Sequence, residues 1–527
     1  MTASQLMVEI VGPGECWSRM TPERLAECVP RVVLEPGGVD WFVAGIDPAD
    51  ADHLRLALCV LVEATAERPS LDGILVELGL TGSRALTWAA ARIAPNTARP
   101  RPLVAMLLEL VQTADRDTVR GLLEELPRRS TALAAVASAA FERRVVELRE
   151  LARSAACDDS PELAEALTAW SVRLIGVGQP DAALAAAYEA TGIYGRLVEH
   201  DPDAYRPALA GALNNLAVAL AAVGRRNEAL QSAEESVRLC RHLAERALRS
   251  YLGELASSVK TLADCLGGLG RRAEAVAVAE EATELYRRLA ARDSDRYLGD
   301  LASSLSTLAR QLRGSGRHAE ALGHTKEAVR VRRRLTRQAP DAHLPDLASS
   351  LVTLAHQLGG LGRHSEAVLQ SKDAVRFYRR LVERGSDEYL AHLAASLSTV
   401  AITLVMVRRR NAALVHAEEA TQLYRRLEEA APGIHLPALA ASLNNLAVTL
   451  AGAGRPQEAL EHAEDAVRIR RRLVRQDPDT YLPALTMSLN NLANRLSGLG
   501  HSREAAGRAK EAAKIHRQLA ESATSEG

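Results

Sequence analysis

The sequence predicts an all-α protein, in which eight consecutive helix pairs occupy residues 159–526 and a mainly helical domain occupies residues 1–158. Composition gives the first indication. The 527-residue chain is 47% hydrophobic but only 3% aromatic, so its apolar residues are mostly Ala, Leu and Val. Ala and Leu favour helices, whereas strands favour β-branched and aromatic residues. The second indication is a motif that recurs every 46 residues, which is typical of a helical array.

The first 158 residues contain no repeat. Two apolar runs around Pro36-Gly37-Gly38 predict a small hairpin over residues 31–43. Prolines then separate six expected helices, at 50–66, 70–79, 83–93, 101–113, 116–126 and 130–155. We expect these elements to form a compact domain that caps the N-terminal end of the array.

We find no catalytic motif in this N-terminal domain. It lacks a GxxxxGK[ST] phosphate loop, a GxSxG elbow and an HExxH pair. Its single histidine, His53, disfavours a metal cluster. Cys16 or Cys28 together with His53 would make a thiol dyad, but the local sequence favours two ordinary buried thiols. We therefore expect no catalytic residue, no metal and no cofactor, and a protein that is not an enzyme.

The repeat is defined by a turn motif of the form GRxxEAL or GRxxEAV, which reads GHSREAA in the last copy. Copies begin at Gly224, and then at 270, 316, 362, 454 and 500, each a multiple of 46 residues further on. Two degenerate copies, GQPDAAL from 178 and RRRNAAL from 408, complete a set of eight without insertion or deletion. Ala recurs in every copy, at 183, 229, 275, 321, 367, 413, 459 and 505. We interpret it as the small core residue at which the two helices of a repeat cross closely.

Each repeat reads as helix A, a tight turn, helix B and a short loop. In helix A of the second repeat, apolar residues follow steps of three and four from Leu209 to Leu220. The turn glycine suits a left-handed backbone, and Pro180 and Pro456 suit the first turn of helix B. The segments at 201–205, 339–343 and 477–481 contain Asp and Pro, so we expect them to be loops between repeats.

The repeat resembles the tetratricopeptide repeat. The run Leu262, Ala263, Gly270, Ala275, Ala282 has the spacing of that family's pattern. Its 46-residue length exceeds the usual ~34 residues, and Leu-Asn-Asn-Leu-Ala in helix A is most similar to the kinesin-light-chain type. The resemblance implies a right-handed superhelix in which helix A lines a concave groove. It also implies that the groove binds a protein or peptide partner.

Polar residues of helix A are the candidate peptide-binding residues. Family members of this type use Asn residues to grip an extended peptide backbone, since Asn offers both a donor and an acceptor. The candidates are Asn214, Asn215, Asn444, Asn445, Asn490 and Asn491, with Asp264, Arg310, His356 and Asn494 at a further groove-facing position. The alternative is that one Asn of each pair bonds a neighbouring helix.

Arginine runs near the end of helix B are a second feature. They lie at 287–288, 332–334, 379–380, 425–426 and 470–472. A basic stripe for phosphate or nucleic acid is one interpretation. We favour cations that complement the helix dipole and pair with Glu or Asp one turn or more earlier, because 65 basic and 66 acidic residues give a net charge of −1. Nucleic acid is therefore a disfavoured partner.

Localisation follows from three absences in the sequence. The six cysteines include no CxxC pair, the chain starts without a signal-peptide pattern, and no apolar run is long enough to span a membrane. We expect a cytoplasmic protein with no membrane partner.

A weaker resemblance links residues 126–152 and the array to the C-terminal arm of bacterial STAND-type signalling proteins, whose repeats sense a ligand. The sequence thus predicts a non-catalytic scaffold or sensor that binds a partner in the groove. The alternative is a regulatory subunit of a bacterial signalling or defence system, which acts through residues 1–158 on an ATPase or effector chain in trans.

Overall fold

The computed structural model describes residues 58, 59, 62, 75, 76, 84–95, 97, 100–127, 130, 132–154, 159–383 and 389–525. The elements formed by these residues are α-helices, so the predicted all-α class is confirmed. The predicted hairpin at 31–43 lies outside the described residues, as do most of the predicted helices at 50–66 and 70–79. The chain divides into two compact bodies, a first body over 1–343 and a second body over 344–527.

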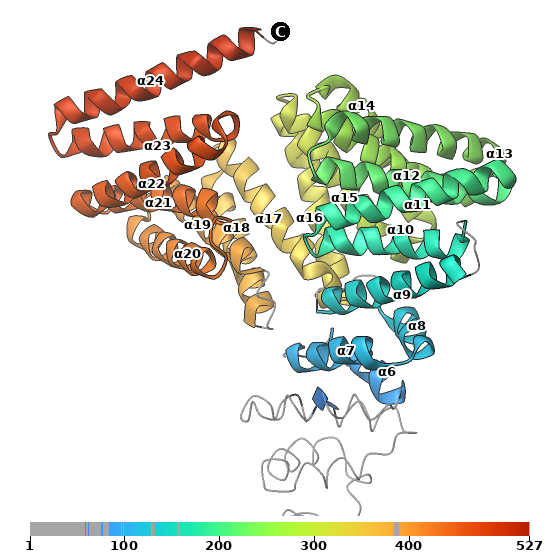
Figure 1. The fold of residues 1–527 in the computed structure, drawn as a ribbon. Coiled ribbons are helices and arrows are strands. Elements are labelled where there is room, and N and C mark those ends of the chain that lie inside the picture. The colour runs from blue at the N-terminus through green and yellow to red at the C-terminus, as the bar shows by residue number, and fades with distance from the viewer. Residues whose placement is uncertain are drawn as a thin grey trace, which may run out of the picture. The chain divides into compact units, whose positions relative to one another are not determined.

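Four helices precede the repeats, close to their predicted positions (Figure 1). They are α6 (Arg84–Ile93), α7 (Arg101–Thr113), α8 (Arg116–Glu125) and α9 (Ala134–Ser154). The Asp115 side chain begins α8 by accepting a hydrogen bond of 2.7 Å from the Thr118 amide. Apolar residues of α6, α7, α8 and the start of α9 share one buried core.

Helix α9 belongs to two cores. Its first half packs with α6–α8, whereas Val145 and Leu148 in its second half pack in the core of the first repeats. Arg149 also forms an ion pair with Glu189 of α11, 40 residues further on. The same spacing recurs in later repeats, where Arg241 of one helix B pairs with Glu281 of the next at 3.0 Å. Helix α9 therefore occupies the place of a helix B that precedes the first repeat.

The predicted helix pairs are confirmed within the described residues (Figure 1). The first body contains α10 (Pro161–Gly176), α11 (Pro180–His200), α12 (Pro202–Ala222), α13 (Arg226–Gly268), α14 (Arg272–Arg292), α15 (Ser294–Gly314) and α16 (His318–Gln338). Helix α13 combines helix B of one repeat with helix A of the next, and the two parts meet at Ala247, where φ is −148° and ψ is 67°.

Helix α17 (Pro340–Gly360) begins beside the boundary of the two bodies. The second body continues with α18 (His364–Glu383), α19 (Leu390–Met406), α20 (Arg410–Ala430), α21 (Leu436–Gly452), α22 (Pro456–Gln476), α23 (Pro478–Gly498) and α24 (Ser502–Ser525). Odd-numbered helices from α17 onward are helix A of their repeat, and even-numbered helices are helix B.

Two small-residue positions recur in the core. The alanine at 183, 229, 275, 321, 367, 413 and 459 is 0% exposed, and its last copy, Ala505, is 9% exposed. A serine of helix A is also buried at 258, 304, 350, 396, 442 and 488. Sequence reasoning missed this serine, although it follows the 46-residue step. Its hydroxyl bonds the preceding helix B at Ser236–Ser258 and at Thr421–Ser442, both 2.8 Å.

The turn between helix A and helix B has the predicted left-handed residue. Glycine adopts a φ of 74° to 84° at 178, 224, 270, 316, 362, 454 and 500. In the sixth repeat Arg408 takes the same place with a φ of 60°. A side chain in this region strains the backbone. The residue after the left-handed position closes each turn, as when the Arg225 amide donates to the Leu220 carbonyl at 2.9 Å.

The predicted inter-repeat loops are wrong, because these segments are helical. Asp201 is the N-cap of α12 and accepts a hydrogen bond of 3.1 Å from the Ala204 amide, and Pro202 is the first residue of the helix. Asp477 and Pro478 start α23 in the same way. Asp and Pro are favoured at helix starts as well as in turns. A single N-cap residue is thus enough to connect α11 to α12.

We expect Arg408→Gly to stabilise the protein, because glycine adopts a positive φ without the steric cost of a side chain. The gain should be about 1 kcal/mol, measured as a higher urea midpoint. Gly454→Ala is the matched reverse change in the next repeat. No atom lies within 4 Å of the added Cβ, so its expected loss of similar size reports backbone strain alone. A lower midpoint for Arg408→Gly would contradict this account.

Candidate peptide-binding face

One position of helix A faces solvent in successive repeats. In the second body it is held by His356, Ile402, Val448 and Asn494, all of which are exposed. In the first body the same position is held by Val218, Asp264 and Arg310, of which Asp264 is half-buried. The residues three and four positions earlier in the chain lie on the same side of the helix, because residues that far apart are neighbours on a helix surface. We call this surface the helix A face.

The predicted asparagines differ in exposure. Asn490 is exposed, Asn214, Asn215, Asn445 and Asn491 are half-buried, and Asn444 is only 9% exposed. The Asn444 Nδ2 donates to the hydroxyl of Ser488 in the next helix A at 2.6 Å. Asn444 therefore takes part in packing between repeats, as the alternative interpretation of these pairs expects. Asn490 has the exposure that a ligand contact needs.

Two of these amides retain unused hydrogen-bonding capacity. The Oδ1 atoms of Asn214 and Asn444 are buried and accept no hydrogen bond. A buried acceptor without a partner costs free energy. In three other repeats the second Asn is replaced by a buried threonine, at 261, 307 and 399. The hydroxyls of Thr261 and Thr399 donate hydrogen bonds to backbone carbonyls of their own helices, at 3.2 and 3.0 Å.

The helix A face of the first body is charged and internally paired. Asp264 forms ion pairs with Lys260 at 3.6 Å and with Arg310 of the next repeat. Gln311, beside Arg310, donates to the Ala263 carbonyl at 3.2 Å. These side chains already neutralise one another, so a ligand here would have to replace existing interactions.

The helix A face of the second body is uncharged over two consecutive repeats. Helices α19 and α21 contain no Asp, Glu, Lys or Arg. Ile402 and Val448 hold the matched solvent-facing position and are 41% and 36% exposed, and Met487 of α23 is 69% exposed. Beside them, the His356 Nε2 bonds the Thr399 hydroxyl at 3.0 Å. This surface thus offers apolar side chains next to amide groups.

One arginine in each of three arginine runs forms an ion pair with a glutamate. Arg287 pairs with Glu327 at 3.0 Å, Arg379 with Glu419 at 2.6 Å, and Arg471 with Glu511 at 2.8 Å. The partner lies 40 residues later, on the next helix B. We expected partners earlier in the same helix, and that detail is wrong for these three residues because adjacent helices B lie side by side.

The described part of the chain has neither a metal-binding cluster nor a membrane-spanning helix. It contains no group of three or more His, Cys, Asp and Glu residues that could hold a metal ion. None of its helices combines the length and apolar character needed to cross a membrane.

Four segments match the model of the tetratricopeptide repeat family, at residues 209–247, 301–336, 439–479 and 485–522. Their first residues are separated by whole multiples of the 46-residue step, and each segment starts in helix A and covers all or most of helix B. The family model therefore has the same register as the repeats in the structure. No curated protein matches the chain.

Several solved structures are similar to parts of the chain. BtubC (BKLC) from P. vanneervenii is 24% identical over 46% of this chain and 90% of its own, with a TM-score of 0.38. A putative kinesin light chain from Podosopora anserina with nearly identical TPR-like repeats is 20% identical over 42% of this chain and 98% of its own, with a TM-score of 0.34. A Rap protein complexed with competence and sporulation factor is 14% identical over 79% and 98%, with a TM-score of 0.37.

The two asparagines Asn444 and Asn490 should respond differently to replacement by alanine. Asn444→Ala removes a buried hydrogen bond to Ser488, so we expect a loss of about 1 kcal/mol in unfolding free energy. Asn490→Ala changes an exposed residue and should stay within about 0.5 kcal/mol of the parent. Urea unfolding followed by circular dichroism measures both. Equal stabilities would show that the Asn444–Ser488 contact contributes little to packing.

Proposed function

We propose that this chain, a tetratricopeptide-repeat protein, is a non-catalytic scaffold that binds a peptide segment of a partner protein on the helix A face of its second body. The observation that supports this most is the uncharged surface of α19 and α21, where Ile402 and Val448 stay exposed at matched positions. A quarter of the residues of the chain are charged, so two charge-free helices in adjacent repeats are a marked departure.

The chemistry of the face suits an extended, largely uncharged segment. Apolar side chains of the ligand would cover Ile402, Val448 and Met487, which removes apolar area from water. The amides of Asn490 and Asn494 would bond the ligand backbone, because each supplies a donor and an acceptor. Repetition every 46 residues presents the same groups to successive parts of one peptide, so the affinity is summed over repeats.

The remaining predicted residues have a smaller part in this proposal. Asn444 has a role in packing between repeats, and the half-buried Asn445 beside it would add a weaker contact to the ligand. Asp264 and Arg310 lie in the first body and already pair with each other. We further propose that residues 1–158 cap the array, because α9 shares its core with the first repeats.

A random peptide library displayed on phage, selected against the full-length protein, tests the proposal. We expect selected peptides to be rich in apolar residues, and their affinity to fall about tenfold in the double variant Ile402→Asp, Val448→Asp. Val415→Asp is the matched control, since Val415 is an equally apolar residue, 61% exposed, on helix B of the same body. Circular dichroism confirms that each variant folds.

Either of two outcomes would contradict this function. Selected peptides that bind the double variant as tightly as the parent place the site elsewhere. An equal loss in Val415→Asp shows that binding follows general surface apolarity rather than the helix A face. The double variant Asn490→Ala, Asn494→Ala is a second test of peptide affinity, and it does not introduce charge.

A further inference from the structure

The turn arginines of most repeats are neutralised by a glutamate three residues later. Arg271 pairs with Glu274 at 2.6 Å, Arg317 with Glu320 at 2.7 Å and Arg455 with Glu458. Arg225 with Glu228 and Arg363 with Glu366 form the same contact. The Glu also lies in the first turn of helix B, where a negative charge is favourable. This local pair is part of the repeat itself.

A second carboxylate reaches the turn arginine from the preceding helix B. Arg317 lies 3.7 Å from Glu280, and Arg455 lies 3.3 Å from Glu418. In both contacts the two residues are 37 positions apart in the chain. The position of Glu280 and Glu418 in helix B therefore lies beside the turn of the next repeat. The turn arginines Arg317 and Arg455 therefore each lie beside two acidic groups.

The turn between α19 and α20 departs from this pattern at both carboxylates. The turn arginine is Arg409, but the residue three positions later is Ala412, and Lys372 stands where Glu280 and Glu418 precede the turns at Arg317 and Arg455. Lys326 holds the same position before the turn at Arg363, but that turn keeps its own Glu366. Arg408 and Arg410 flank Arg409, and Arg408 also replaces the turn glycine at a φ of 60°. This turn thus has neither of the two carboxylates, and Arg408 adds an arginine at a position where the other repeats have glycine.

These four cations are exposed and unpaired within the described part of the chain. Lys372, Arg408, Arg409 and Arg410 are all exposed, and none forms an ion pair with a described residue. The surrounding acidic groups are used elsewhere: Asp373 pairs with Arg376 at 3.1 Å, and Glu418 pairs with Arg455. We call Lys372 and residues 408–410 the cation cluster.

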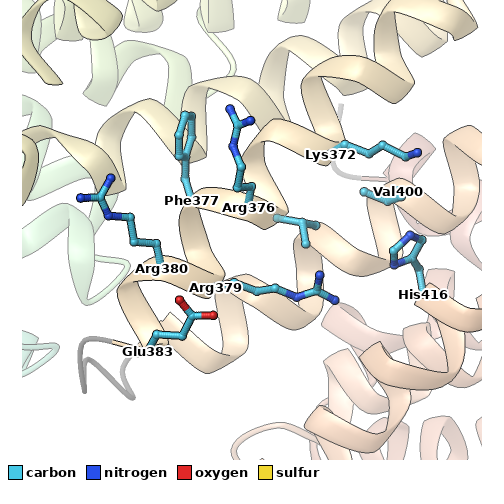
Figure 2. Close-up of a pocket in the computed structure, with 9 residues that line it drawn as sticks. Lys372, Arg376, Phe377, Arg379, Arg380, Glu383, Val400 and His416 are labelled. Carbon is cyan, nitrogen blue, oxygen red and sulfur yellow. The ribbon is translucent and has the colours of Figure 1, made fainter. Parts of the chain in front are cut away.

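A pocket of about 690 Å³ adjoins the cluster along α18 (Figure 2). Lys372 and His416 lie on the same side of the pocket with Val400 between them, and Arg379 and Arg380 lie near Glu383. Burial lowers the pKa of His416, Glu419 raises it, and the charges of Arg379 and Lys372 lower it.

Because this pocket lies beside Lys372, a ligand bound to the cation cluster has room to extend between α18 and α20.

We propose that the cation cluster binds an acidic peptide segment, whose carboxylates the four side chains neutralise. Hydrogen bonds between charged groups are stronger than neutral ones, and arginine binds a carboxylate through two parallel N–H groups. The site shares no residue with the helix A face, so it does not depend on the function proposed above.

The extent of positive charge favours a peptide over nucleic acid. Nucleic acid is held by many phosphate contacts along a basic surface. Here the neighbouring basic residues are already neutralised, Arg379 by Glu419, Arg455 by Glu458 and Arg363 by Glu366. The cation cluster itself consists of one turn and one lysine, a short basic surface that matches a short run of carboxylates.

Fluorescence anisotropy with a labelled oligoglutamate peptide and the full-length protein tests the proposal. The key variant is Lys372→Glu, Ala412→Glu, which introduces both carboxylates that the turns at Arg317 and Arg455 have and so keeps an arrangement that the chain already uses. We expect its affinity to fall about tenfold. Binding by the parent should weaken as salt is added.

Lys510→Glu is the matched control, because residue 510 holds the position of 372 in the last repeat and the charge change is the same. We expect its affinity to stay within about twofold of the parent. The proposal is overturned if the parent does not bind the peptide at low salt, or if the key variant binds equally well. It is also overturned if Lys510→Glu loses as much affinity, or if a single-stranded oligonucleotide binds the parent more tightly than the peptide.

Discussion

The close contact between the two helices at the buried alanine of each repeat is the constraint on which the structure depends. With a methyl group at this position, helix A and helix B approach closely enough for their leucines to meet the helices of the neighbouring repeat. A larger side chain would separate the axes at a cost of about 1–3 kcal/mol. Because no repeat encloses a core of its own, such a separation would also weaken the packing of its neighbours.

The constant spacing between repeats has a second consequence, which is that surface and buried polar contacts repeat as well. Helix A places a serine against the preceding helix B, as in Thr283–Ser304 at 2.9 Å. Helices B are joined by arginine–glutamate pairs 40 residues apart, and even α9 takes part through Arg149 and Glu189. Each exposed pair contributes little alone, about 0–1 kcal/mol. Their regularity makes a departure in a single repeat visible.

Packing uses one side of helix A and leaves the solvent-facing side free to vary. In the first body this side carries Asp264 and Arg310, which neutralise each other, whereas in the second body it carries Ile402 and Val448. The turn at Arg408 varies independently, since turn residues lie outside the core. One array can therefore display an uncharged face and a separate basic site without a change in how its helices pack.

The sequence by itself determined the helix pairs, their number and their register, because a period of 46 residues without insertion leaves the apolar pattern unambiguous. It also located the turn glycines and the core alanines. Local ambiguity explains the wrong inter-repeat loops: Asp-Pro at 201–202 fits a turn or a helix start, and packing selected the helix start.

Only the tertiary structure decided which polar residues remain available, because a side chain's partners come from residues about one repeat away. Asn444 and Asn490 hold the same position in the repeat, yet Asn444 bonds Ser488 whereas Asn490 is exposed in the last helix A. Asp264 pairs with Arg310, and the turn arginines Arg317 and Arg455 pair with glutamates of the preceding helix B. The sequence shows Lys372 and Arg409 as separate basic residues, and the folded repeats bring their two positions together.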